Sequence, residues 1–354
     1  MTAISNWQGD SLIRIEVFKL NLPLRTRFAV AKGSADVKTN LLAVLNNRYI
    51  GEAATSVYYG PTLEQLEKDL QSGARFIEQL GAIDNATLEK VSQLTINPIA
   101  RSALTGMLLN YLSGESGRYP WEILSLSTPV GIKSSFTIGI DDSSKMVSAI
   151  QNSEYPIVKI KLGGPDDVKV IESLKDVVGK EIRVDANGGW DLARAEEMIY
   201  YLARAGVTII EQPTEAKLVA DWPRLKGKNA EVELVIDEGV GSVDDFDAVS
   251  ANVDGVNIKM EKSGGILEAL KVAEAAKQSK KKIMLGCMVS SSIGIAQSVY
   301  MSSLADYIDL DGPQLLQHDI ARGITFHREH IEVDREIIGG PTLIRDVFEK
   351  YIAS

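Results

Sequence analysis

The most constraining feature of this chain is a set of three short apolar segments that each end on a carboxylate. In chain order they are IRVDAN at 182–187, IIEQP at 209–213 and VIDEG at 235–239, which supply Asp185, Glu211 and Asp237. The acids are 26 positions apart in both steps, from 185 to 211 and from 211 to 237. This interval is about the length of one strand and one helix, so the acids are expected at the same end of three successive parallel strands. Three oxygen ligands that converge in this way predict a Mg²⁺ site.

The same alternation of short apolar strands and helical segments runs through most of the chain. From Ser134 onward the expected strands are SSFTIGI, PIVKIKL, IRVDA, VTIIEQP, LVIDEG, GVNIKM, KIMLGC and YIDLD. Eight strands with helices between them predict a closed parallel barrel.

The first part of the chain has a different pattern. Residues 12–22 alternate as a strand, 39–55 read as a hairpin that turns near Asn46–Asn47, and 23–36 between them read as a polar loop. Helical spacing follows over 62–82, 84–95 and 97–114. We expect an α+β lobe over residues 1–130, a barrel over 131–323, and a segment over 324–354 that includes a closing helix near 341–352 and folds back onto the lobe.

Composition limits the classes of function. The chain has 354 residues, of which 45% are hydrophobic and 24% charged, as in ordinary globular proteins. Its net charge of -10 argues against a nucleic-acid partner, because phosphate binding needs a basic face. A single cysteine, Cys287, excludes an intramolecular disulfide and fits a reducing compartment. With neither a signal-peptide pattern nor a run of membrane-spanning length, we expect a cytoplasmic protein without a membrane partner.

Charged residues interrupt one of the expected barrel strands. Lys159 and Lys161 lie two apart in PIVKIKL, so their side chains share one face of the strand. In a barrel mouth each ammonium group raises the cost of protonating the other, and burial adds to that cost, so a lysine there can act as a base near neutral pH. An edge strand with a solvated lysine face is the alternative interpretation.

A second lysine site follows from the strand order. Lys259 ends the expected sixth strand and therefore lies across the barrel from Lys161 on the second. Two lysines on opposite faces of a metal-bound substrate can remove and return a proton at one carbon. Lys259 can also be read as a charge flanking a helix, and Lys262 is a second candidate for the same role.

The acids have alternative interpretations as well. Each of the three strand-end carboxylates could cap the following helix, which Asp does well, but their equal spacing together with the lysine motifs favours a site. At the eighth strand, Asp309 and Asp311 share one face. They could be further metal ligands, form a turn before Gly312–Pro313, or clamp a cationic group of the substrate.

Taken together, these motifs resemble the enolase superfamily, and within it the muconate-lactonising-enzyme subgroup. The resemblance covers nearly the whole chain and implies a (β/α)7β modified TIM barrel with an α+β capping domain made by the N-terminal region and the C-terminal tail. It is carried by KIK at 159–161, DAN at 185–187, EQP at 211–213, DE at 237–238 and NIK at 257–259. It implies that Asp185, Glu211 and Asp237 bind one Mg²⁺ per subunit. It further implies that Lys161 and Lys259 are the acid/base pair, and that Lys159 tunes Lys161.

Within the subgroup, GCMVSSSIG at 286–294 and DLDGP at 309–313 look most like dipeptide epimerases of the L-Ala-D/L-Glu type. That resemblance implies that Asp309 and Asp311 hold the free ammonium group of a dipeptide. The chain departs from many such epimerases at Ser290 and Gly239, where they have an acid and a serine. We expect further substrate contacts from the capping loops and strand ends, at Lys32, Tyr58, Thr137, Cys287 and Met288.

The implied reaction is a Mg²⁺-dependent 1,1-proton transfer at the α-carbon of the C-terminal residue of a dipeptide, through an enolate intermediate. The enzyme would be an isomerase with a small-molecule substrate, and relatives of this kind commonly form homo-oligomers. One alternative is another reaction of the superfamily, carried out by a muconate cycloisomerase, an o-succinylbenzoate synthase or an N-acylamino-acid racemase. Their substrates carry no ammonium group to pair with two acids. A barrel that binds without catalysing is the other alternative.

Overall fold

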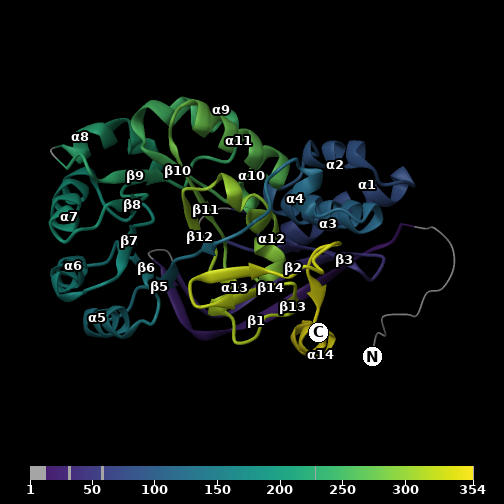
Figure 1. The fold of residues 1–354 in the computed structure, drawn as a ribbon, viewed down its shortest axis with the longest axis horizontal. Coiled ribbons are helices and arrows are strands. Elements are labelled where there is room, and N and C mark those ends of the chain that lie inside the picture. Colours follow the sequence, from purple (N-terminus) through teal and green to yellow (C-terminus); the bar gives the residue numbers. More distant parts are fainter. Residues whose placement is uncertain (1–12, 31–32, 57–59, 228, 354) are drawn as a thin grey trace.

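The computed structural model describes residues 13–30, 33–56, 60–227 and 229–353, and Figure 1 shows two structurally different parts. An antiparallel sheet in the order β1-β2-β3 opens the chain, formed by β1 (Ile15–Val30), β2 (Gly33–Leu45) and β3 (Tyr49–Ala53). Three helices follow, α1 (Leu63–Leu80), α2 (Asn85–Ser92) and α3 (Pro98–Ser116), and then the short α4 (Pro120–Ile123). We call this first part the cap.

The cap helices begin and end where the sequence supplies capping residues. The hydroxyl of Thr62 accepts a hydrogen bond from the Gln65 backbone amide at the start of α1, and Gly81 ends this helix in the left-handed conformation. Asn97 caps α3 in the same way, and Pro98 occupies its first turn. The predicted helices over 62–82, 84–95 and 97–114 are therefore confirmed to within a few residues.

The second part is an eight-stranded parallel sheet in the order β12-β11-β10-β9-β8-β7-β6-β5. Its two edge strands, β5 and β12, approach each other at one point. There the Ser135 amide, just before β5, donates to the Ile308 carbonyl in β12 at 3.1 Å. All eight predicted strands are present, and the sheet curls into the predicted barrel. In chain order the strands are β5 (Phe136–Ile138), β6 (Ile157–Lys161), β7 (Glu181–Asp185), β8 (Ile209–Glu211), β9 (Glu233–Ile236), β10 (Gly255–Ile258), β11 (Lys282–Gly286) and β12 (Tyr307–Asp309).

Helices connect the barrel strands, and many of them lie on the outside of the sheet (Figure 1). They are α5 (Ser143–Asn152), α6 (Asp167–Ser173), α7 (Leu192–Arg204), α8 (Trp222–Lys226), α9 (Val243–Val249), α10 (Met260–Ser263), α11 (Ile266–Gln278), α12 (Ser292–Tyr300) and α13 (Gly312–Leu315). Buried side chains of these helices and of the strands form one large hydrophobic core, whereas the cap has cores of its own.

The C-terminal tail returns to both parts. Strands β13 (Ala321–Arg322) and β16 (Thr342–Leu343) pair with each other, and the hairpin of β14 (Ile324–His327) and β15 (His330–Val333) adds to β4 (Ile132–Lys133). The final helix α14 (Arg345–Tyr351) packs on β1, where Phe348 and Phe18 form an edge-to-face ring contact at 5.4 Å. The predicted domain boundaries near 130 and 323 fall between α4 and β4 and between β13 and β14, and they stay predictions.

One expectation about the cap was wrong. Residues 23–36 were expected to form a polar loop, but β1 continues to Val30 and β2 begins at Gly33, so most of this stretch is paired strand. The pairing changes register between Pro23 and Phe28, which concealed the strand pattern in the sequence. Among the described residues, no helix is both long and apolar enough to cross a membrane.

The contact between β3 and α3 gives a stability prediction. A Cβ added at Gly51 would lie 1.8 Å from the backbone oxygen of Ala103, so the strand and the helix would have to separate. Gly51→Ala should therefore lower the free energy of unfolding by about 1–3 kcal/mol in urea denaturation. Gly33→Ala is the control, since an added Cβ there has no neighbour within 4 Å. Equal stability of the two variants would contradict this packing.

Candidate active site

The three predicted acids meet at one end of the barrel. Asp185 and Glu211 are the last residues of β7 and β8, where the strand register pairs them directly, and Asp237 immediately follows β9. All three side chains are buried. Neither Asp185 nor Asp237 caps the helix that follows it, because α7 is capped by Asp191 and α9 by Ser242. The alternative interpretation as capping residues is therefore excluded for Asp185 and Asp237.

The predicted lysines face these acids. Lys161 pairs with Asp185 at 2.5 Å, and Lys259, directly after β10, pairs with Asp237 at 2.7 Å. β6 is an inner strand of the sheet, and both of its lysines are buried, which rules out the solvated edge strand. Strands β6 and β10 are separated in the sheet by β7, β8 and β9, so Lys161 and Lys259 stand on opposite sides of the barrel mouth.

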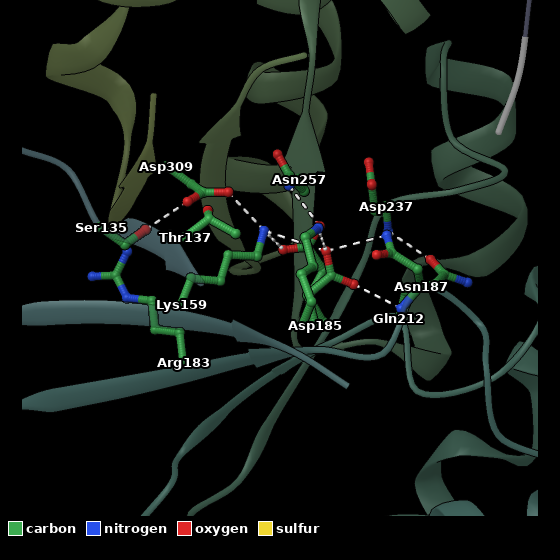
Figure 2. Close-up of polar contacts among 12 residues, drawn as sticks. Ser135, Thr137, Lys159, Arg183, Asp185, Asn187, Gln212, Asp237, Asn257 and Asp309 are labelled. Carbon is green, nitrogen blue, oxygen red and sulfur yellow. Dashed lines mark hydrogen bonds and ion pairs between the residues drawn. The ribbon is translucent and has the colours of Figure 1, made fainter. Parts of the chain in front are cut away.

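Lys159 is the centre of a buried network of ion pairs. Its ammonium nitrogen lies 2.6 Å from Glu211, 2.6 Å from Asp309 and 3.4 Å from Asp185 (Figure 2). Burial by itself lowers the pKa of Lys159, but attraction to Asp309 and Glu211 outweighs burial and holds this pKa well above its ordinary value. Lys159 therefore stays charged and joins the carboxylates of three strands.

Lys262, the alternative to Lys259, has a different environment. Its ammonium group donates to the Asp237 side chain at 2.6 Å, to the Asp237 carbonyl and to the Asn257 carbonyl at 2.8 Å. These three acceptors use the donor capacity of the ammonium group. Lys259, in contrast, lines the cavity described below, so the geometry favours Lys259 as the lysine that meets a substrate.

Two residues in strained backbone conformations fix the acids in place. Asn187 and Gln212 both have positive φ, 44° and 41°, which is costly for residues other than glycine. The Asn187 amide groups donate to both oxygens of Asp185, at 2.8 and 3.2 Å. The side-chain oxygen of Gln212 accepts from the backbone amides of Asp237 and Glu238, at 2.8 and 2.9 Å (Figure 2 shows Gln212 beside Asp237).

Asp309 and Asp311 have unequal surroundings. Asp309 accepts from Ser135 at 2.6 Å and pairs with Lys159, whereas Asp311 accepts from the Thr137 backbone amide at 2.6 Å. Burial and then the neighbouring Asp309 carboxylate raise the pKa of Asp311 to about 7. A cationic group beside Asp311 would lower this pKa. The raised pKa therefore favours the predicted clamp for a substrate cation over a permanent cationic partner within the protein.

A cavity of about 140 Å³ lies between the cap and the barrel mouth. Nine of the predicted site residues line it, namely Lys159, Lys161, Lys259, Asp237, Asp309, Asp311, Thr137, Cys287 and Met288, while Asp185 and Glu211 are buried. Lys32 and Tyr58 lie outside the described residues. The sequence reasoning missed Lys38, Asn187 and Glu238, which also line the cavity. Asn187 and Glu238 stand inside the DAN and DE motifs, whereas Lys38 carries no motif.

The residues at the strand ends fit a divalent cation. Burial, and to a lesser extent the nearby Asp185 carboxylate, raises the pKa of Glu211. Burial, followed by the neighbouring Asp237 carboxylate, raises the pKa of Glu238 to about 7. Buried oxygens of Asn187 and Glu238 have no hydrogen-bond partner in the described structure. Excess carboxylate and unsatisfied oxygen ligands suit Mg²⁺. Among the described residues, no three acidic, histidine or cysteine side chains are gathered closely enough to hold a metal. Asp185 and Asp237 are instead paired with Lys161, Lys259 and Lys262.

The family of the chain follows from comparison with known proteins. A family model described as "Enolase C-terminal domain-like" matches residues 143–337, which is more than half of the chain. The chain therefore belongs to this family, as its barrel and its strand-end lysines and acids indicate.

Individual relatives indicate the class of reaction. A curated L-Ala-D/L-amino acid epimerase of Flavobacterium johnsoniae is 30% identical over 316 residues, 86% of this chain and 92% of that protein. A hydrophobic dipeptide epimerase of Roseobacter litoralis is 29% identical over 330 residues, 89% of this chain and 94% of that protein. Both are named as epimerases, a class of isomerase. The fold matches the crystal structure of a dipeptide epimerase from Cytophaga hutchinsonii complexed with Mg and D-Ala-L-Val, with a TM-score of 0.88 at 22% identity, covering 96% of this chain and 98% of that one.

The network around Lys159 gives a second stability prediction. Lys159→Met removes the charge that three buried carboxylates share and should lower the free energy of unfolding by about 3–5 kcal/mol, measured in urea without divalent ions. Lys145→Met, which breaks the exposed pair with Asp141, should change it by less than about 1 kcal/mol. Similar losses in the two variants would show that Lys159 does not compensate the buried acids.

Proposed function

We propose that this protein is a Mg²⁺-dependent dipeptide epimerase that inverts the α-carbon of the C-terminal residue of a dipeptide. The observation that carries the proposal is the placement of Lys161 and Lys259 on opposite sides of one cavity that also contains Asp311. Inversion by proton transfer needs one group on each face of the carbon. The names of the curated relatives support the same reaction.

The substrate carboxylate would bind beside Asp185, Glu211 and Asp237. When these residues hold Mg²⁺, the ion supplies positive charge that disperses the negative charge growing on the carboxylate as the α-proton leaves. Here Asp185 is paired with Lys161, and Asp237 is paired with Lys259 and Lys262, so lysine ammonium groups and a metal would compete for the oxygens of these two acids.

The two lysines act as acid and base in turn. One neutral lysine takes the α-proton as the carbon–hydrogen bond breaks, which leaves an enolate. The other lysine, as ammonium, donates a proton to the opposite face of the same carbon. The lysines end with exchanged protonation states and reset by proton exchange with water. Lys159, held charged by Asp309 and Glu211, keeps a positive charge beside Lys161 throughout.

The other end of the dipeptide would meet Asp311. Its buried carboxylate lines the cavity next to Thr137, and a free ammonium group is the cation that a dipeptide offers. Asp309 would contribute negative charge without a direct hydrogen bond to the substrate, since Ser135 and Lys159 already donate to its oxygens. We also propose cytoplasmic residence and a homo-oligomeric assembly.

Lys38 on β2 supports a preference for an acidic side chain on the epimerised residue. Its half-buried side chain lines the cavity from the cap, and in the described structure it has no hydrogen bond or ion pair. Burial lowers the pKa of Lys38 to about 8, although Glu261 opposes this change. An anionic group of the substrate would supply the partner that the described residues do not.

A deuterium-labelling experiment separates the dipeptide epimerase from the alternative functions. The protein is incubated with Mg²⁺ and a library of L,L-dipeptides in D₂O, and uptake of one deuteron is followed by mass spectrometry. A cycloisomerase or an N-acylamino-acid racemase would leave every dipeptide unlabelled but act on muconate or on N-acylated amino acids. A non-catalytic barrel would label none of them, and its melting temperature would not rise with Mg²⁺.

Each lysine of the pair should be essential for epimerisation. Lys161→Ala and Lys259→Ala should each reduce the rate by roughly 10²–10⁴-fold, because one face of the carbon loses its proton carrier. Lys169→Ala, on the exposed surface of α6, serves as the control and should match the wild type. A Lys161→Ala enzyme that epimerises at the wild-type rate would contradict the assignment.

The charge of Lys38 should select between substrates of equal size. At pH 7 we expect kcat/KM for L-Ala-L-Glu to exceed that for L-Ala-L-Gln by about tenfold, the effect of one charged hydrogen bond. Since Lys38 is charged below its pKa of about 8, the ratio should fall as the pH rises through 8. Lys38→Met should remove the preference, and Lys133→Met, exposed on β4, should keep it. An unchanged ratio in Lys38→Met would exclude Lys38 as the selector.

A further inference from the structure

The N-terminus of α12 is held by two carboxylates from different parts of the chain, of which Glu52 is buried and Asp319 is half-buried. Glu52 of β3 accepts hydrogen bonds from the Ser291 hydroxyl at 2.5 Å, from the Ser291 amide at 3.1 Å and from the Gly294 amide at 3.1 Å. Asp319, which follows α13, accepts from the Ser292 amide at 3.2 Å. Every residue of α12 is buried, so its first amides are satisfied within the protein rather than by water. The two carboxylates accept from Ser292 and Gly294, and the Ser291 hydroxyl accepts from the Ile293 amide at 3.2 Å.

Glu52 also contacts β2, the neighbouring strand of the cap. The Asn40 side chain on β2 donates to Glu52 at 2.7 Å and to the Val289 carbonyl at 3.1 Å. Its oxygen accepts from the Thr55 amide at 3.1 Å. Asn40 and Glu52 are both buried, and together they connect β2 and β3 to the segment 287–291 after β11. We call this group of hydrogen bonds the cap latch.

The cap latch connects two walls of the cavity. On the cap side, Lys38 and Thr55 line the cavity. Lys38 is two residues from Asn40, and Thr55 is three residues from Glu52. On the barrel side, Cys287, Met288 and Val289 line it. The hydrogen bonds of Glu52 and Asn40 therefore set the distance between the wall that carries Lys38 and the wall that follows β11.

We propose that Glu52 is a positioning residue that fixes the cap against the barrel and thereby sets substrate affinity, without touching the substrate. The proposal deepens the proposed function and rests on it for its kinetic readout. Burial raises the pKa of Glu52 to about 7, while hydrogen bonds from Ser291 and Asn40 lower it and Asp319 raises it. At pH 8 the carboxylate is ionised and accepts from all its donors.

The matched variants are Glu52→Gln and Asp319→Asn. Each replaces a carboxylate at the N-terminus of α12 by an amide of the same shape, but only Glu52 also contacts the cap. At pH 8, Glu52→Gln should raise KM for a turned-over dipeptide about tenfold and change kcat less than threefold, because the lysines and acids of the barrel stay in place. Asp319→Asn should leave KM within twofold. The Kd for Mg²⁺ should be unchanged in both.

Hydrogen exchange gives a readout that needs no substrate. Glu52→Gln should speed amide exchange by at least tenfold in both 38–43 and 287–294, whereas Asp319→Asn should affect only 292–294 and 319–321. Ser291→Ala removes one donor to Glu52 and also the hydroxyl that accepts from the Ile293 amide. It should shift KM and the exchange of 38–43 in the same direction by less, and it replaces Glu52→Gln if that variant does not fold. Failure of the wild type to turn over any dipeptide would reject the proposed function while the exchange test still decides the role of Glu52. Unchanged exchange in 38–43, or equal KM effects of the two matched variants, would overturn the proposal.

Discussion

Negative charge buried at the mouth of the barrel is the constraint on which the rest of this structure depends. Asp185, Glu211 and Asp237 are carried by neighbouring parallel strands, so the strand spacing keeps their carboxylates together. Isolated charges in such a place would be strongly destabilising, and the protein compensates them with lysines on adjacent strands. Lys159 shows this most clearly, since it contacts acids from β7, β8 and β12.

The same compensation gives the site its chemistry. In the proposed function, the lysines that stabilise the acids in this structure exchange protons with the substrate. Folding and the proposed catalysis therefore use the same pairs, Lys161 with Asp185 and Lys259 with Asp237. The strained backbone of Asn187 and Gln212 is consistent with this view, because strain persists where hydrogen bonds to the acids hold it.

The cavity divides its tasks between two parts of the fold. The barrel provides the acids and lysines from strand ends, and the cap closes the cavity with Lys38 and its neighbours. Proteins that share a barrel can therefore keep one reaction and change the side chains that they accept. The two relatives carry different names, L-Ala-D/L-amino acid epimerase and hydrophobic dipeptide epimerase. The cap latch of Asn40 and Glu52 makes the two parts act as one site.

The sequence by itself determined the barrel and most of its charged interior. Parallel strands place their ends at one edge, so equal spacing was enough to bring Asp185, Glu211 and Asp237 together, and the two-residue period of a strand put Lys159 and Lys161 on one face. The strand pattern left Lys262 as an alternative to Lys259, and only the family resemblance chose between them. The sequence did not show β1 running on to Val30, and it gave no motif for Lys38. Only the tertiary structure decided these points, and it alone showed that Asp309 is bound by Lys159 and Ser135 while Asp311 faces the cavity. Local periodicity reports the face of a strand, whereas these contacts join residues far apart in the chain and depend on how the cap packs on the barrel.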